Sequence, residues 1–216
     1  MHKKKTTSTK PKMIGEVRDQ LQQDYHRNIY TVQQSAMVPQ QLIVNIDQTP
    51  VKMVPVSEYT MSEKGADCVS VIGGDDKKMF TAVFSVTMNG KFLPMQLIYG
   101  GKTRRCHLKM DFPVGFHVTH NPKHWSNTDT TKELLTKIII PYTKKVKKEM
   151  KLPDSQKAII VWDTFKRQNN NSVRALLEKH NIAEVVVPAN TTAFNQPLDV
   201  SVKNFKDGML KKSRRR

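Results

Sequence analysis

Apolar residues along the chain gather in short continuous runs that polar turns separate. Two of these runs, residues 42–46 and 158–162, lead directly into a carboxylate, Asp47 in the first case and Asp163 in the second. A continuous apolar run of this length predicts a strand that is buried on both faces. Open α/β sheets carry their chemistry at the carboxyl ends of such strands, so the two acidic strand ends are the first candidate site.

A β-hairpin is predicted near the middle of the chain. Residues 80–88 and 92–99 are rich in β-branched and aromatic side chains, and Asn89-Gly90 between them is a strong signal for a tight turn. The chain therefore supplies an antiparallel pair beside the strands that end in carboxylates.

Proline and polar composition predict where regular structure stops. Pro50 cannot donate to a strand ladder, so we expect the first strand to break after Asp47. Residues 51–76 are expected to hold short strands or an excursion from the sheet that a turn closes. Residues 102–125 are expected to be irregular.

Helical periodicity predicts the remaining elements. Apolar residues recur at helical spacing in four segments, which are residues 13–34, 131–150, 172–180 and 200–210. Asn127 is expected to cap the second of these, and Pro141 within it predicts a kink or a break. Residues 182–187 predict another buried strand.

This order of elements predicts an α/β fold. The sheet should be mixed, with an antiparallel hairpin plus parallel strands, and helices should lie on both faces. A length of 216 residues suits one domain with flanking segments. We expect a basic leader that is partly disordered or helical at residues 1–40, the folded domain at residues 41–210 and a basic tail at residues 211–216.

The charge balance favours a polyanionic partner. Lys and Arg number 36 against 19 Asp and Glu, which gives a formal net charge of +17. Nucleic acid is the commonest partner of such a chain, although a basic chain can also be merely soluble. The tail fits a nuclear-import signal, a nucleic-acid contact or a solvated end, and these interpretations stay open.

Membrane and secretory classes are not favoured. No basic amphipathic helix with an aromatic or leucine-rich face stands out, and no apolar run approaches a membrane span. We expect no signal peptide, because no apolar core follows the basic amino terminus. Cys68 and Cys106 are too few for a disulfide framework and predict a reducing compartment.

Three carboxylates are candidates for metal binding. Asp47 and Asp163 would converge if their strands are neighbours, and Asp199, in the first turn of the last predicted helix, could complete the group. Mg²⁺ prefers such hard oxygen ligands, and two ions about 3.5–4 Å apart can clamp a phosphoryl displacement. A lone Asp after a strand is more often a turn former or a helix cap, and spacing alone leaves both interpretations open.

Several motifs that occur in order across residues 42–210 are more specific than the three carboxylates alone. They are Asn45-Ile46-Asp47-Gln48-Thr49-Pro50, residues 81–84 and 90–103, His124-Trp125-Ser126-Asn127, Val161-Trp162-Asp163, and Gln196-Pro197-Leu198-Asp199. With these motifs the chain resembles the catalytic domain of DDE-type transposases, in the pogo/Tigger/Jerky branch of the Tc1/mariner superfamily. The 35 residues between Asp163 and Asp199 are close to the spacing typical of that superfamily.

The resemblance implies a fold, a chemistry and a location. The fold would be ribonuclease-H-like, with the first Asp on the first strand, the second after the fourth strand and the third on a later helix. Asp47, Asp163 and Asp199 would bind two Mg²⁺ or Mn²⁺ ions, cut DNA and join the freed 3′-hydroxyl to a target. The implied partner is DNA in the nucleus, without a small-molecule substrate, and dimerisation stays open.

The chain departs from the family pattern in three respects. Residues 193–199 differ slightly from the usual motif, and Lys166-Arg167 adds cations where Gly is common. Such transposases also carry amino-terminal helix-turn-helix domains, and nothing before Leu42 has room for them. We therefore expect a fragment, the product of a truncated gene or a captured catalytic domain.

Two other functions share part of this pattern. The first is a domesticated nuclear protein that binds DNA without cleaving it, and the second is a metal-dependent nuclease that acts on RNA. The intact carboxylates favour the cleaving enzyme, since an inactive copy is free to lose them.

Basic side chains near the motifs are candidate phosphate contacts. They are Lys102, Arg104 and Arg105 after the hairpin and Lys166 and Arg167 after Asp163. As charge runs they fit solvated surface equally well.

A cluster of potential zinc ligands follows the hairpin, at Cys106, His107, His117, His120 and His124. Their spacing matches no structural zinc pattern, so polar surface or a DNA-facing loop is the preferred interpretation. Trp125 is expected to be a core aromatic rather than a platform for stacked bases.

Overall fold

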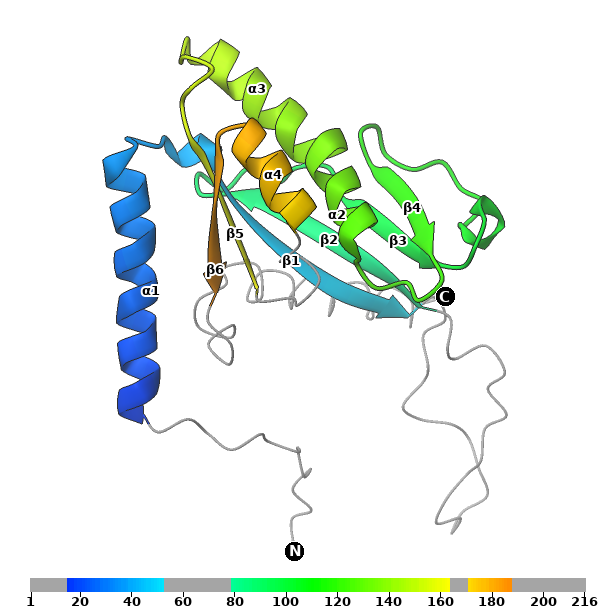
Figure 1. Ribbon diagram of the computed structural model, residues 1–216. Helices are drawn as coiled ribbons and strands as arrows, with labels where there is room; N and C mark the ends of the chain where they lie inside the picture. Colours follow the sequence, from blue (N-terminus) through cyan, green and yellow to red (C-terminus); the bar gives the residue numbers. More distant parts are fainter. Residues whose placement is uncertain (1–14, 53–78, 164–170, 188–216) are drawn as a thin grey trace, which may run out of the picture.

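The computed structural model describes residues 15–52, 79–163 and 171–187, and six strands in these ranges form one mixed sheet in the order β4-β3-β2-β1-β5-β6 (Figure 1). The strands are β1 Ile43–Lys52, β2 Met79–Thr87, β3 Gln96–Gly100, β4 His117–Asn121, β5 Ala158–Asp163 and β6 Ile182–Val187. The pairs β1–β2 and β2–β3 are antiparallel, whereas β3–β4, β1–β5 and β5–β6 are parallel. The predicted mixed sheet is confirmed.

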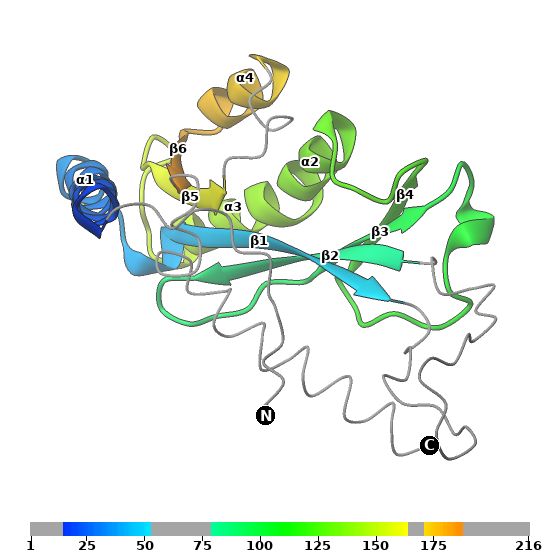
Figure 2. The ribbon, with the colours of Figure 1, turned by 90° about the horizontal axis from the view of Figure 1, so that it is seen from below.

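Helices and short turns flank this sheet. They are α1 Gly15–Ser35, α2 Thr128–Leu134, α3 Ile140–Glu149 and α4 Asn171–Lys179, the π-helical turn η3 Leu135–Ile139, and the 3₁₀ turns η1 Gln40–Leu42 and η2 Arg104–Cys106. Seen from below, α2, α3 and α4 lie on the same face of the sheet, and α1 stands beside the edge near β6 (Figure 2). The predicted last helix, residues 200–210, lies outside the described residues.

The hydrophobic core is centred on β1 and β5. Val44, Ile159 and Ile160 are buried on these two adjacent strands, as the continuous apolar runs predict. Full burial of one such side chain is worth about 1.5–3 kcal/mol. From α1, Tyr25 joins the same core, with Ile29 packed against it, so the leader helix is anchored to the sheet through the apolar face that its periodicity predicts.

Strand β1 does not break at Pro50, contrary to the sequence-based expectation. It pairs with β2 up to Lys52. Since the carbonyl of Ile43 accepts from the Met88 amide, the odd-numbered residues of β1 bond to β2 and Pro50 faces the other side. On that side β5 has already ended at Asp163, so the missing N–H costs no ladder bond.

The hairpin and the segment after it also differ from expectation. Strand β3 begins only at Gln96, because Pro94 interrupts the predicted partner strand and leaves one bridge between Val86 and Phe92. Residues 102–125 contain β4, which was expected to be irregular. Strand β4 is polar because it is an edge strand, paired on one side only among the described residues.

The last strand and the long helix refine the prediction. Strand β6 was expected to be buried, yet in the part of the chain that the structure describes it is the outermost strand of the sheet, and Val186 is 41% exposed. The helix predicted from residue 131 starts at Thr128, with Asn127 as its cap. Pro141 produces no break, because the π-helical turn η3 precedes it and Pro141 falls in the first turn of α3.

Candidate active site

The two acidic side chains expected at strand ends lie on adjacent parallel strands. The ladder between β1 and β5 pairs Ile43 with Ile159 and Asn45 with Val161. Asp47 and Asp163 each lie two residues beyond the last of these pairs, so the same register brings both carboxylates to the carboxyl-end side of the paired segment. Asp163 ends β5, whereas Asp47 lies within β1 at the level where β5 ends.

Both carboxylates lie on the same face of the sheet. Side chains alternate along a strand, so Asp47 and Asp163 share the face of the other odd-numbered residues of β1 and β5. Gln96 lies on the opposite face and donates from Nε2 to the carbonyl of Thr130 in α2, at 2.8 Å. The carboxylates therefore face away from α2.

Buried polar side chains flank Asp47 along β1. Asn45 and Thr49 lie two residues before and after it, on the same face, and are 8% and 1% exposed. The oxygens Asn45 Oδ1 and Thr49 Oγ1 have no hydrogen-bond partner among the described residues. The face thus offers a row of hard oxygen atoms, which is the donor chemistry that Mg²⁺ and Mn²⁺ prefer.

Asn45 also fixes the strand alignment, a role that sequence reasoning missed. Its Nδ2 donates to the carbonyl of Val161 at 3.1 Å, across the β1–β5 pair. One signal for this residue was visible in the sequence, since Asn45 is the single polar residue in the run 42–46. A buried amide in an apolar strand requires a partner, and the partner is the neighbouring strand that carries Asp163.

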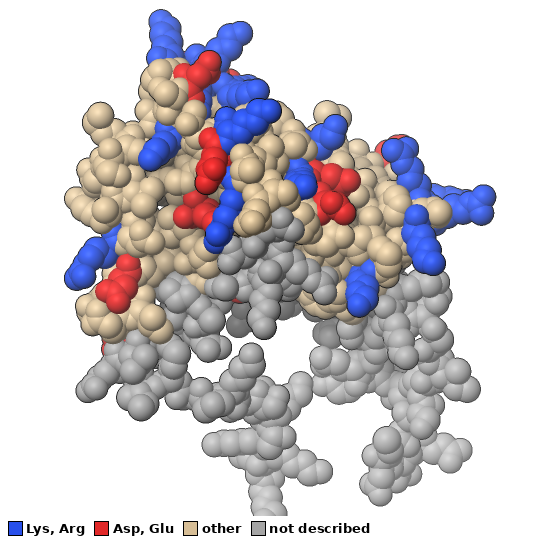
Figure 3. All heavy atoms as spheres, in the orientation of Figure 1, with Lys and Arg blue, Asp and Glu red and all other residues tan. Residues whose placement is uncertain are grey.

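Some of the predicted site residues cannot be placed. Asp199, Lys166 and Arg167 lie outside the described residues. Lys102, Arg104 and Arg105 are exposed on the loop after β3, where η2 forms. The surface in Figure 3 carries many more Lys and Arg than Asp and Glu side chains, which agrees with the net charge of +17.

The five candidate zinc ligands after the hairpin belong to three separate sets of contacts. His117 contacts Glu133 of α2 through Nε2 and Oε2 at 2.9 Å, and His124 Nδ1 lies 3.4 Å from the Thr81 hydroxyl. Cys106, His107 and His120 come together elsewhere.

Trp125 is not a core residue, contrary to expectation. Its side chain is 39% exposed, and its ring lies 4.9 Å from the His124 ring. The backbone carbonyl of Trp125 accepts from Asn121, so the strand that precedes it fixes the position of the segment. No helix among the described residues is long and apolar enough to cross a membrane.

Comparison with solved structures identifies the fold. The catalytic domain of Mos1 mariner transposase matches with a TM-score of 0.56 at 11% identity, over 94% of this chain and 76% of that chain. A pre-cleavage Mos1 transpososome matches with a TM-score of 0.56 at 13% identity, over 95% and 54% of the two chains. At these identities the likeness concerns the fold, and it confirms the predicted ribonuclease-H-like architecture. In this chain Asp163 ends the fifth strand rather than the fourth, because β4 adds an edge strand.

Comparison of sequences identifies the family. The chain is 25% identical over 179 residues to a human protein named "Pogo transposable element with KRAB domain", covering 82% of this chain and 28% of that protein. The mouse protein of the same name is 24% identical over 190 residues, covering 84% and 30%. The chain thus spans less than a third of the length of these relatives.

The family match covers two of the three candidate carboxylates. The family described as DDE superfamily endonuclease matches residues 77–214, which include Asp163 and Asp199 and begin after Asp47. The resemblance to a pogo-type Tc1/mariner DDE domain is confirmed by these findings together. The chain belongs to the DDE superfamily endonuclease family.

Proposed function

We propose that this chain is a transposon-derived DNA endonuclease and strand-transfer domain in which Asp47, Asp163 and Asp199 bind divalent metal. The observation that carries the proposal is the parallel pairing of β1 with β5, which supports a site in which Asp47 and Asp163 lie on neighbouring strands and on one face of the sheet. A single acidic strand end has many explanations, but two aligned carboxylates flanked by buried oxygens have few. The family match covers residues 77–214, and this supports including Asp199 in the proposal as the third ligand.

The side chains of the site suit Mg²⁺ or Mn²⁺, and we include two ions in the proposal. When bound, such ions stabilise the charge that develops on a phosphate during in-line displacement. The chain itself holds two carboxylates on rigid neighbouring strands, and the Asn45 amide fixes their alignment. One of the Mos1 structures is described as a catalytic domain with Mg, which supports divalent metal use.

DNA is the proposed substrate. Related structures are described as a Mos1 paired-end complex with left transposon end and as a Mos1 strand transfer complex. The exposed cations Lys102, Arg104 and Arg105 of this chain are proposed phosphate contacts, and a nuclear location follows from a chromosomal substrate. The domesticated alternative keeps the same DNA contacts and lacks the cleavage.

A plasmid-nicking assay tests the cleavage. Purified chain is incubated with supercoiled plasmid in Mg²⁺ or Mn²⁺, beside an Asp163→Asn variant. Asp154→Asn is the matched control, since Asp154 is exposed in the loop before the opposite end of β5. Nicking should require added metal, persist in the control and fall by at least about 100-fold in Asp163→Asn, the scale of a lost transition-state contact.

The possible outcomes separate the alternatives. Equal nicking by Asp163→Asn and the unmodified chain would refute the proposed site. Plasmid binding without nicking in all three proteins would favour the domesticated DNA-binding protein. Preferential cleavage of single-stranded RNA over plasmid would identify the RNA nuclease instead.

Salt dependence tests the DNA-contacting loop. Each phosphate contact adds about −0.9 to the slope of log K against log salt concentration for duplex DNA. The triple variant Lys102→Ala, Arg104→Ala, Arg105→Ala should therefore have a shallower slope by about two to three. Alanine at the exposed Lys144, Lys145 and Lys148 of α3 is the control, because it removes the same number of charges, and an equal loss there would assign the effect to net charge alone.

A further inference from the structure

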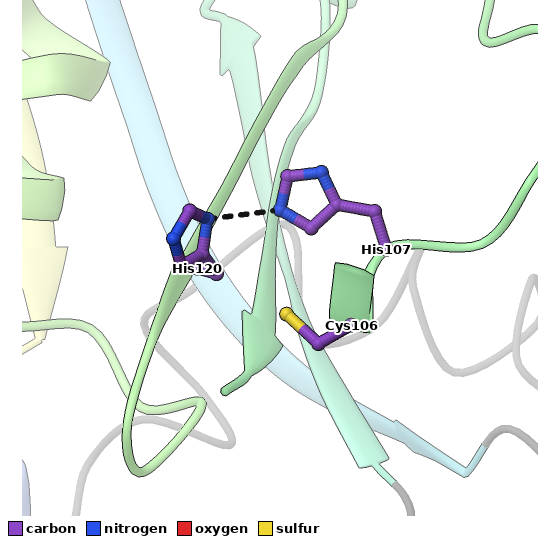
Figure 4. Close-up of side chains that lie close together, drawn as sticks. All are labelled: Cys106, His107 and His120. Carbon is purple, nitrogen blue, oxygen red and sulfur yellow. Dashed lines mark hydrogen bonds between the residues drawn. The ribbon is translucent and has the colours of Figure 1, made fainter. Parts of the chain in front are cut away.

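Three potential metal ligands converge beside the outer strands of the sheet. Cys106 ends the turn η2, His107 follows it, and His120 belongs to β4 (Figure 4). The ligand atoms of the three side chains all lie within 4.8 Å of one another. His107 Nε2 and His120 Nδ1 are 3.1 Å apart. The three residues come from two separate segments that the β3–β4 pairing brings together.

We propose that Cys106, His107 and His120 form a zinc-binding site. Tetrahedral zinc holds sulfur at about 2.3 Å and imidazole nitrogen at about 2.0–2.1 Å, so its ligand atoms lie about 3.3–3.6 Å apart. The 3.1 Å between the two histidine nitrogens and the upper limit of 4.8 Å for all three ligand atoms are compatible with these values after small side-chain rotations. Three protein ligands with a fourth position left for water is an established zinc arrangement.

A second observation points to the same place. Tyr99 is 1% exposed, and its hydroxyl has no hydrogen-bond partner among the described residues. Its ring lies 5.2 Å from the His107 ring. Cys106 packs against the small buried cluster that contains Tyr99. A buried hydroxyl without a partner is costly, and a water held at the fourth position would supply one.

The chain also makes room for the cysteine. A Cβ on Gly101 would lie 2.6 Å from Cys106 Cβ and 2.7 Å from its Sγ. Only glycine at position 101 therefore allows Cys106 to take this place beside β3. Cys106 is not in a disulfide, and its Sγ lies 2.9 Å from the carbonyl of Thr103.

The donor set selects the class of metal. One thiol and two imidazoles are soft and borderline ligands, which favour zinc over Mg²⁺. A hydrogen bond between two neutral imidazoles is the competing explanation for the contact between His107 and His120, and it requires no cysteine.

The zinc site would be separate from the proposed active site. His120 is in register with Tyr99, Phe80 and Val51 across the sheet. Asp47 lies four residues before Val51 on β1, and strand spacing and rise per residue put it about 20 Å from His120. A bound zinc would tie η2, with its exposed Arg104 and Arg105, to the edge strand β4. It would therefore order the loop that carries the proposed phosphate contacts.

Metal substitution tests the site on the full chain. The protein is stripped with a chelator and titrated with Zn²⁺ alone, and then with Co²⁺, which absorbs in the near ultraviolet when a thiolate binds it. One zinc per chain should bind, with a rise in Tm of about 5–10 °C at a hundred times the dissociation constant. The thiolate–cobalt band should vanish in Cys106→Ser and persist in Cys68→Ser, the chain's other cysteine.

The histidines are tested in the same way. His120→Asn should weaken zinc binding by at least about tenfold, whereas His124→Asn, the matched control, should not. Circular dichroism of each metal-free variant shows whether it is folded. If Cys106→Ser does not fold, the cobalt band of the Cys68→Ser chain still tests Cys106, because Cys106 is then the only cysteine in the chain. A cobalt band that depends on Cys68, or zinc affinity unchanged by His120→Asn, would overturn the proposal. Plasmid nicking does not enter these measurements, so the zinc site and the nuclease proposal fail independently.

Discussion

Three glycines allow the effect of backbone strain to be separated from the effect of a steric clash, and they make the position of Cys106 testable. Gly101 has a φ of 158°, which L side chains rarely adopt, and an added Cβ would meet Cys106 at 2.6 Å. Gly90 has a φ of 86°, but an added Cβ would meet nothing within 4 Å. Gly100 has an ordinary φ, and its Cβ would lie 3.4 Å from His124.

The magnitudes follow from these geometries. Alanine in a left-handed backbone conformation costs about 1–2 kcal/mol, and overpacking a filled site costs about 1–3 kcal/mol more. We therefore expect Gly90→Ala to lower the free energy of unfolding by about 1–2 kcal/mol and Gly101→Ala to lower it by about 2–5 kcal/mol. Gly100→Ala should be close to neutral, because the reduced entropy of the unfolded chain offsets a tight contact.

Urea unfolding in the presence of a chelator measures the series without any metal contribution. The midpoint should shift in the order Gly100→Ala, Gly90→Ala, Gly101→Ala, with a constant dependence on denaturant. A Gly101→Ala chain no less stable than Gly90→Ala would refute the reasoning, since Cys106 would then not occupy the space beside Gly101. The same variant should also lose the zinc-dependent rise in Tm.

Further predictions concern buried polar groups, each checked by urea unfolding. Burial raises the pKa of Tyr25 to about 12, so the stabilisation from its protonated phenol is complete below pH 10 and declines as the pH rises towards 12. This loss reaches about 3 kcal/mol, and Tyr25→Phe should lack it; equal alkaline slopes in both proteins would contradict the assignment. Lys147 is buried, its Nζ donates to the Asp154 carbonyl at 2.9 Å, and burial lowers its pKa despite the opposing effect of Asp154. Because the unfolded chain binds this proton more tightly, Lys147→Met should be more stable than the unmodified chain at neutral pH, and this difference in the free energy of unfolding should shrink towards pH 10.5. Gln96 is fully buried and bonds to the Thr130 carbonyl, so Gln96→Ala should cost about 2–4 kcal/mol, whereas a cost under about 0.5 kcal/mol would remove its role in joining β3 to α2.

The helix cap at Asn127 and the tight turn at Gly90 could be predicted from the sequence, because each depends on a few neighbouring residues. The Asn127 side chain accepts from the Thr130 amide at 2.8 Å, and the Thr130 hydroxyl accepts from the Asn127 amide at 2.8 Å. This reciprocal cap explains why the start of α2 could be placed within a few residues. Gly90, with its positive φ, turns the chain after β2 as the Asn-Gly pair predicts.

Elements at the edges of the sheet could not be predicted in the same way. Strand β4 is polar, with His117, Thr119 and His120 among its residues, because one neighbouring strand suffices to hold it. The apolar sequence of β6 predicts a buried strand, and only the strand order shows that β6 is the outermost strand on its side among the described residues. The composition of a segment indicates how buried its side chains tend to be. Whether the strand lies at the centre or the edge of the sheet depends on how the whole chain folds.

The Cys/His group shows the same limit for a site. Spacing rules for zinc read pairs of ligands that lie near one another in sequence. Cys106 and His107 are adjacent, but His120 reaches them only because β4 pairs with β3 in parallel. Of the five candidates in the sequence, the pairing selects these three and directs His117 to the opposite face.

Asp47 shows that the proposed active site depends on strand register more than on strand ends. The sequence places a carboxylate after each apolar run, but β1 continues beyond Asp47 and only β5 ends at its carboxylate. A shift of one residue between the strands would turn Asp47 towards α2. Apolar alternation cannot prevent such a shift, because β1 is buried on both faces, at Ile43 on one face and at Val44 on the other. The bond from Asn45 to the Val161 carbonyl can prevent it, since a slipped strand would leave this amide buried without its partner. The polar residue that interrupts the apolar run therefore keeps the two carboxylates aligned.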